Sequence, residues 1–188
     1  MIKKMLSMLF FRFSKWSLVT EEGPGGPAVF VAAPHTSNWD FILMLALAWH
    51  HQLDIRFLGK ASLFGRWRGP LMRKLGGIPI DRENPQDVVS ELATVMKESP
   101  DIGLVVTPDG TRGPHQYWKS GFYRIAREAG LPITLGYVDR NTLTTGLGPT
   151  FYLTGNKRTD MENIRSFFSD KGGFHPNRRV EPRMRDED

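Results

Sequence analysis

Short, unbroken apolar runs alternate along this chain with stretches that have helical periodicity. The run at residues 28–33 is apolar at every position, and residues 102–107 and 133–138 are similar runs with one Thr each. Strands that are apolar on both faces are typical of a parallel sheet covered by helices. Shorter strands are expected at residues 55–58, 78–80 and 149–153. Helices are expected at residues 39–51, 61–75 (broken near Gly69 and Pro70), 85–99, 119–130 and 161–168. The alternation predicts an α/β fold, with a largely parallel mixed sheet flanked by helices.

Composition narrows the class of protein further. At 188 residues the chain fits one domain with a core of its own, and it has no Cys. The lack of Cys excludes a disulfide scaffold, a thiolate zinc site and a cysteine-linked intermediate. The net charge of +5 favours an anionic partner, such as lipid headgroups, an acidic carrier protein or nucleic acid. No apolar run approaches the roughly 18 to 20 residues that span a bilayer.

The first 19 residues predict a basic amphipathic helix. Apolar side chains recur there at spacings of three and four, at Ile2, Met5, Leu6, Leu9, Phe10, Phe13 and Trp16. Lys4, Arg12 and Lys15 lie on the opposite side and interrupt any signal-peptide run. Such a helix is typical of a membrane-interface anchor, and a core-packing helix is the alternative.

These patterns predict three parts of the chain. Residues 1–20 form the amphipathic helix, followed by a Gly/Pro-rich linker at 21–27. Residues 28–170 form the main domain. Residues 171–188 form a polar tail that is expected to be loose at its end.

His35 and Asp40 are the leading catalytic candidates. They follow the apolar strand at residues 28–33 and stand at the start of the next helix. A turn before a helix allows Asp40 to fold back onto one ring nitrogen of His35, which leaves the other nitrogen free to accept a proton. The alternative is that Asp40 only complements the helix dipole and that His35 is a structural strand-end residue.

Two further polar segments each follow a predicted strand. The first segment, residues 76–82, ends at Arg82. The second ends with Asp109, Gly110, Thr111 and Arg112, and Lys119 follows it. Guanidinium groups bind phosphate bidentately, although an ion pair with a neighbouring Asp is the alternative for each Arg. The turn at Gly110 can aim backbone N–H groups at an anion, and Lys119 is either a further cation or a solvated surface residue. Because ligands bind beyond the carboxyl ends of parallel strands, these segments and His35 are expected to converge.

Other sites are not expected. His50 and His51 are adjacent on a helix and point apart, and no His-Glu-x-x-His pattern is present, so no metal is predicted. The chain contains neither a phosphate loop ending in Lys-Ser/Thr nor a dinucleotide fingerprint, and no cofactor is predicted.

The segments together resemble the glycerolipid acyltransferase family, which includes 1-acylglycerol-3-phosphate acyltransferases and tafazzin-like enzymes. His35 and Asp40 match its His-x4-Asp motif, and residues 77–82 match its Gly-x4-Arg motif. Residues 109–112 match its Glu-Gly-Thr-Arg motif, with Asp109 in place of the usual Glu. Residues 119–121 and 131–133 are similar to its later basic-Gly and apolar-Pro segments, so the similarity runs from about residue 29 to 138.

The resemblance implies an O-acyltransferase of phospholipid biosynthesis. It implies His35 as general base, Asp40 as its orienter, and Arg82 and residues 109–112 as acceptor binders. The donor would be acyl-CoA or acyl carrier protein, the acceptor a lysophospholipid such as 1-acylglycerol-3-phosphate, and the transfer direct. The expected location of the protein is the cytoplasmic face of the cell membrane, to which the N-terminal helix would bind. Asp109 puts the usual acceptor contact in question, and the short chain raises the prospect of a reduced acyl channel.

Two alternatives remain from the sequence. One is an acyltransferase for a phosphate-free lysolipid of the lyso-ornithine type. The other is a non-catalytic, basic membrane-binding or nucleic-acid-binding protein with decayed motifs. Nucleic acid is not expected as a partner, because Arg66, Trp67 and Arg68 form the only cluster of interleaved basic and aromatic residues.

Overall fold

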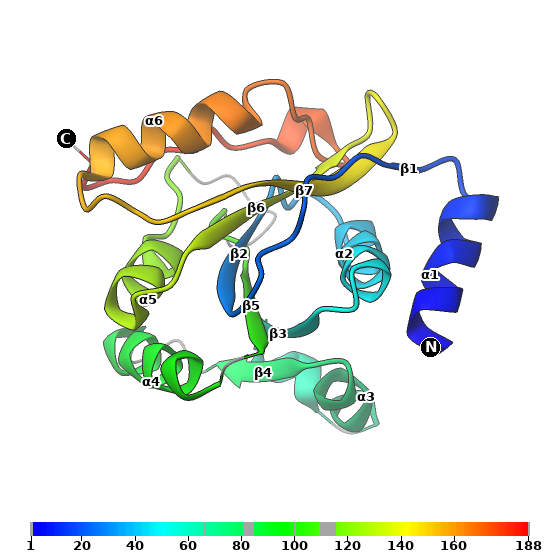
Figure 1. The fold of residues 1–188 in the computed structure, drawn as a ribbon, viewed down its shortest axis with the longest axis horizontal. Helices are drawn as coiled ribbons and strands as arrows, with labels where there is room; N and C mark the ends of the chain where they lie inside the picture. The colour runs from blue at the N-terminus through cyan, green and yellow to red at the C-terminus, as the bar shows by residue number, and fades with distance from the viewer. Residues whose placement is uncertain (1, 66, 81–84, 100, 110–115, 188) are drawn as a thin grey trace.

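The computed structural model describes residues 2–65, 67–80, 85–99, 101–109 and 116–187. Within these residues, seven strands form one sheet in the order β1-β7-β6-β2-β5-β3-β4 (Figure 1). The strands are β1 (Ser17–Leu18), β2 (Ala28–Ala33), β3 (Asp54–Lys60), β4 (Gly77–Ile80), β5 (Ile102–Val106), β6 (Ile133–Asp139) and β7 (Thr144–Phe151). All neighbouring pairs are parallel except β6 and β7. The predicted α/β fold with a largely parallel mixed sheet is therefore confirmed.

Helices cover both faces of this sheet (Figure 1). They are α1 (Ile2–Phe13), α2 (Trp39–His50), α3 (Arg68–Lys74), α4 (Pro85–Glu98), α5 (Gly121–Ala129) and α6 (Lys157–Phe168), with short 3₁₀ turns η1 (Ala61–Phe64) and η2 (Pro176–Arg178). One core cluster joins the sheet to α4, α5 and α6, and a second joins it to α2. The centre of the sheet is fully covered, since every residue of β6 is buried and five of six in β2 are. This is the burial that unbroken apolar runs predict.

Several element boundaries differ from the sequence prediction. The expected helix at 61–75 is divided into η1, which ends at Phe64, and α3, which begins at Arg68; Gly69 and Pro70 lie inside the first turn of α3. Proline has no backbone N–H, and it is tolerated there because the N–H groups of the first turn have no carbonyl acceptor within the helix. β7 begins at Thr144 and α6 at Lys157, both earlier than expected. Asn156 caps α6, and its side chain accepts the Thr159 N–H at 3.1 Å.

The N-terminal helix is shorter than expected. α1 ends at Phe13, and Ser17–Leu18 form β1, which pairs with β7. α1 packs on α2 through Ser7, whose hydroxyl donates to the Ala46 carbonyl at 2.6 Å. The apolar side chains Ile2, Met5, Leu6, Met8, Leu9 and Phe13 are all exposed, with Phe13 at 81%. The exposed side chains favour the interface anchor, whereas the packing of α1 on α2 is what a helix at the domain edge would show, so the choice between the two stays a prediction. None of the helices in the described ranges is long and apolar enough to cross a bilayer.

The C-terminal tail is packed rather than loose. Met184 is buried beside Trp118, with which it forms an isolated bridge. The buried Glu187 carboxylate accepts from Arg165 at 2.7 Å and from the Met184 N–H at 2.9 Å. Salt-bridged and hydrogen-bonded carboxylates can be buried at a polar chain end, and composition alone does not reveal such partners.

Candidate active site

His35 and Asp40 meet at the edge of the sheet where β2 ends. His35 Nδ1 lies 3.3 Å from Asp40 Oδ2, so Asp40 folds back as the sequence predicts. The same oxygen accepts the backbone N–H groups of Thr36 and Ser37, each at 2.7 Å. Asp40 is only 7% exposed, and Nδ1 facing its carboxylate favours the tautomer that leaves Nε2 to accept a proton. The arrangement has the geometry of a base with its orienting acid.

Asp109 lies directly beside this pair. β2 and β5 are parallel neighbours, so the residues that follow them arrive at the same edge of the sheet. Asp109 Oδ2 accepts the His35 backbone N–H at 2.5 Å, and its other oxygen is buried with no hydrogen-bond partner among the described residues. Burial raises the pKa of the Asp109 carboxyl, against the lowering effect of the His35 N–H and ring. These contacts fix the main chain of His35, and the predicted acceptor contact of Asp109 stays a prediction.

The remaining predicted binding residues are only partly covered by the structure. Arg82, Gly110, Thr111 and Arg112 lie outside the described residues. Lys119 lies just before α5, and its backbone N–H donates to the Pro108 carbonyl at 2.8 Å, one residue from Asp109. The convergence expected from the sequence is therefore confirmed for His35 and Asp109. The backbone of Lys119 also lies near Asp109, through its hydrogen bond to Pro108.

A large apolar cavity opens beside His35 and Asp40. Its volume is about 560 Å³, within the range of small-molecule sites. It lies between α2 and the sheet, and most of its lining side chains are apolar, including Phe30, Ile42, Met44, Leu47, Phe57, Leu63, Met72 and Leu147. His35, Asn38 and Asp40 also line it. The sequence did not reveal this cavity, because the same apolar residues would serve equally well to fill a core.

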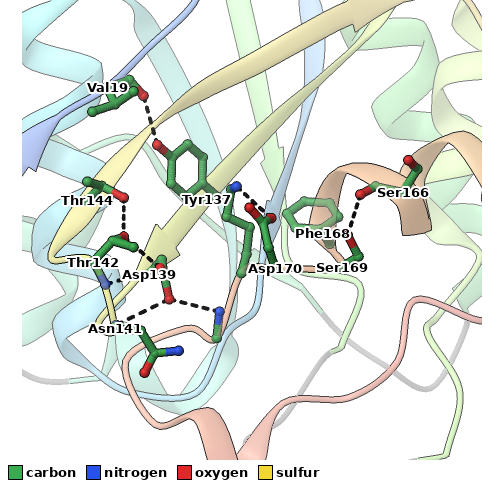
Figure 2. A network of polar contacts seen from close by, with 12 residues as sticks. Val19, Tyr137, Asp139, Asn141, Thr142, Thr144, Ser166, Phe168, Ser169 and Asp170 are labelled. Carbon is green, nitrogen blue, oxygen red and sulfur yellow. Dashed lines mark hydrogen bonds and ion pairs between the residues drawn. The ribbon is translucent and has the colours of Figure 1, made fainter.

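A C-terminal segment that the sequence analysis assigned to the tail also reaches the motif. The His175 backbone N–H donates to Thr36 Oγ1 at 2.9 Å, and the Phe174 ring makes stacked contacts with both Trp16 and Trp39. Asp139, at the end of β6, holds the start of this segment by accepting the Gly172 N–H at 3.0 Å (Figure 2). A backbone donor and a stacked ring leave no motif in a sequence, which is why these residues were missed.

No group of three or more metal-ligating His, Asp or Glu side chains occurs in the described part of the chain. The described part of the site contains one imidazole and two buried carboxylates beside an apolar cavity. This set suits proton transfer next to a long apolar substrate.

Comparison with known proteins agrees with that chemistry. The family model described as Acyltransferase matches residues 17–134, more than half of the chain, and the chain belongs to the acyltransferase family. It is similar to the 1-acyl-sn-glycerol-3-phosphate acyltransferase of Streptococcus pneumoniae, with 31% identity over 148 residues covering 72% of this chain. The chain spans 54% of that relative's length.

The fold is also similar to that of a solved structure. The crystal structure of PlsC, the 1-acyl-sn-glycerophosphate (LPA) acyltransferase of Thermotoga maritima, matches with a TM-score of 0.56. The match covers 90% of this chain and 75% of that chain at 16% identity, and it shows the likeness of fold.

Proposed function

We propose that this acyltransferase moves a fatty acyl group from acyl-CoA or acyl carrier protein to the free hydroxyl of a lysophospholipid, with 1-acylglycerol-3-phosphate as the leading acceptor. The observation that carries the proposal is the His35–Asp40 pair, with Nδ1 and Oδ2 3.3 Å apart, on the wall of an apolar cavity. The activities in the names of the two similar proteins support the same acceptor class.

His35 acts as the general base in this proposal. Its Nε2 takes the proton of the acceptor hydroxyl while the hydroxyl oxygen attacks the thioester carbonyl. The new C–O ester bond forms, the C–S bond breaks, and the thiolate leaves with the proton returned by the imidazolium. Asp40 keeps Nδ1 protonated and stabilises the imidazolium through the contact at 3.3 Å. No acyl-enzyme is needed, which is consistent with a chain that has no Cys.

The apolar cavity is the proposed site for an acyl chain. A fatty chain next to His35 would be removed from water by the apolar side chains of α2 and the sheet, which favours binding by about 25 cal/mol per Å² of apolar surface buried. The carbonyl of such a chain would then lie at the end of the cavity that carries His35 and Asp40.

The acceptor headgroup is assigned to the loops after β4 and β5. Arg82, Arg112 and Lys119 supply cations for a phosphate, and Gly110 and Thr111 supply backbone and hydroxyl donors. Arg82 follows β4 by two residues, and Asp109 follows β5 by three, so both loops leave the edge of the sheet at which His35 lies.

We further propose that α1 binds the membrane surface, on the cytoplasmic face of the cell membrane. Its exposed apolar side chains suit the interface, and Lys3, Lys4 and Arg12 suit anionic headgroups. Leu63 of η1, Leu71 of α3 and Trp67, which precedes α3, are exposed apolar side chains as well. Leu63 also lines the cavity, so an exposed apolar side chain lies at the wall of the proposed acyl site.

The test is transfer of a labelled acyl group from acyl-CoA to a panel of lysolipids by purified protein. Wild type is expected to acylate phosphate-bearing lysolipids, and His35→Ala is expected to lose on the order of 10² to 10⁴ in rate, as general bases do. His51→Ala, at the opposite end of α2, is the matched control and is expected to retain activity. Wild-type turnover by His35→Ala, or no transfer to any lysolipid by wild type, would contradict the proposal and favour a non-catalytic membrane protein.

Acceptor identity is tested with Arg82→Ala in the same assay. We expect a higher KM for phosphate-bearing acceptors, an unchanged KM for the donor, and a smaller gap between acceptors with and without phosphate. Equal effects on both acceptor types would point to a structural role for Arg82 or to a phosphate-free acceptor of the lyso-ornithine type.

A further inference from the structure

Residues 172–175 form a short loop that returns from α6 to the motif, and they lie outside the region matched by the family model. The loop is tied to the end of β6 by two hydrogen bonds. The Gly172 N–H donates to Asp139 Oδ1 at 3.0 Å (Figure 2), and the Arg140 N–H donates to the Gly173 carbonyl at 3.1 Å. Because β6 is the neighbour of β2 in the sheet, this attachment holds the loop next to the residues that follow β2.

Thr36 joins the loop to the catalytic pair. Its hydroxyl, on a residue that is 1% exposed, accepts the His175 backbone N–H at 2.9 Å. Its own backbone N–H donates to Asp40 Oδ2 at 2.7 Å, and that oxygen faces His35 Nδ1. A continuous series of polar contacts therefore runs from the loop through Thr36 to Asp40 and His35.

Phe174 makes a second connection through its ring. The ring stacks on Trp39 at a centroid distance of 6.4 Å and on Trp16 at 6.0 Å, and the Arg140 guanidinium lies 4.8 Å from its centroid. Trp39 is the first residue of α2 and directly precedes Asp40. Phe174 therefore supports the start of the helix that carries the orienting carboxylate.

Gly173 shows how closely the loop approaches the motif. A Cβ atom at this position would lie 3.0 Å from Thr36 Oγ1 and 3.1 Å from Pro34 Cβ, and its φ of +69° is in the left-handed region that favours glycine. A side chain at this position would therefore be closer to the motif than an ordinary van der Waals contact allows.

We infer that Thr36 and Phe174 are positioning residues, through which the loop at residues 172–175 holds the His35–Asp40 pair in its reactive geometry. The inference rests on the proposed function, because it assigns a role in the step that His35 performs. Misplacing a reacting group by about 1 Å costs on the order of 10² in rate, so support from this loop affects turnover directly. Neither residue touches the substrate in this scheme.

The test compares Thr36→Val with Thr36→Ser in the transfer assay. Thr36→Val keeps the shape and leaves the His175 N–H without its acceptor, whereas Thr36→Ser keeps the acceptor. We expect kcat to fall roughly tenfold to a hundredfold in Thr36→Val, with donor and acceptor KM close to wild type and the folded state retained at the assay temperature. Thr36→Ser is expected to restore most of kcat.

Phe174 provides an independent pair of variants. Phe174→Leu keeps an apolar side chain and loses the stacking, and Phe174→Tyr keeps the ring. We expect the same kcat-selective loss in Phe174→Leu and recovery in Phe174→Tyr, while Tyr152→Ala, an exposed ring after β7, stays at wild-type kcat. If Thr36→Val does not fold, this pair decides the matter alone.

The outcomes separate the inference from the proposed function. An active wild type and an inactive His35→Ala, together with wild-type kcat in Thr36→Val and Phe174→Leu, would overturn the inference and leave the function standing. Rates that fall only in step with the folded fraction, without recovery in Thr36→Ser or Phe174→Tyr, would also overturn it. An inactive wild type would instead contradict the proposed function.

Discussion

A single carboxylate oxygen of Asp40 connects the residues of the His35–Asp40 motif. Asp40 Oδ2 receives the backbone N–H groups of Thr36 and Ser37 and faces His35 Nδ1, while Oδ1 is buried without a hydrogen-bond partner in the described structure. The negative charge is therefore concentrated where an imidazolium would form. A neutral amide in its place could still accept backbone N–H groups, but it would not stabilise that charge.

Asp40→Asn is accordingly expected to lose on the order of 10² to 10⁴ in kcat while its melting temperature stays near that of wild type. The measurement is steady-state transfer with a thermal melt on the same preparation. Asp54→Asn, which alters an exposed partner of Arg56, serves as the control for the chemical change. Full turnover in Asp40→Asn would exclude Asp40 as the orienting acid.

Asp109 should give the protein a pH-dependent stability term. Burial raises the pKa of its carboxyl, so the folded state holds this proton more tightly than the unfolded state does. That contribution to the free energy of unfolding is fully present below the ordinary pKa of 3.8 and is lost as pH rises through the higher folded value. We expect the melting temperature of wild type minus that of Asp109→Asn to decrease as pH rises from about 4 to neutrality. Parallel melting curves across this range would show that Asp109 titrates as it does in the unfolded chain.

At the scale of elements, α1 is the least embedded helix. It touches α2 around Ser7 and leaves Leu9 and Phe13 exposed, at 45% and 81%. Such a helix can lose apolar side chains without opening a cavity in the core.

Leu9→Glu combined with Phe13→Glu is therefore expected to release the protein from anionic vesicles and to leave activity on detergent-dispersed substrate intact. Wild-type binding should weaken with salt, because each basic residue contributes about 1 kcal/mol near an anionic surface and is screened beyond roughly 8 to 10 Å. Thr94→Glu with Val95→Glu, on exposed positions of α4, adds the same charge on the other face of the sheet. Vesicle sedimentation is the measurement, and retention of the α1 double mutant on vesicles would count against the anchor.

The elements best predicted from the sequence are those whose boundaries are marked by neighbouring residues in the sequence. β2 and α2 begin where predicted, because the apolar run marks the start of β2 and the turn at Thr36–Asn38 marks the start of α2. β1 has two residues and exists only because β7, far along the chain, offers it a partner edge. The same distinction holds at the site. The fold-back of Asp40 on His35 spans five residues and was predictable, whereas the bond from His175 to Thr36 joins distant segments through a backbone N–H.

At the scale of the whole molecule, the cavity between α2 and the sheet is the proposed site of the acyl chain. Gly136 of β6 lines it, and a Cβ atom there would meet only ordinary contacts, at 3.9 Å from Leu147 and 4.0 Å from the Val31 carbonyl. A Cβ atom can therefore be added at this position without a backbone clash.

Gly136→Val is expected to shift the preference of the enzyme towards shorter acyl chains, because the added methyl groups occupy cavity volume. The measurement is kcat/KM across a series of acyl-CoA chain lengths, with Gly26→Ala, in open space on the linker, as the control. An unchanged chain-length profile in a folded Gly136→Val protein would mean that the acyl chain lies elsewhere.

The strand pairing of β1 has a consequence for how this enzyme would work on a membrane. Three residues, 14–16, join the end of α1 to Ser17, whose N–H is held by the Leu143 carbonyl at 2.8 Å. A fully extended chain covers at most about 13–14 Å over those four steps, so α1 cannot reach far from the sheet edge. With α1 in the bilayer, the reactive centre would stay at a fixed height above the lipid to which it is bound. Successive turnovers would then use lysolipids from one vesicle. The time for which α1 stays bound would set how many of them are acylated before the protein dissociates and binds another vesicle.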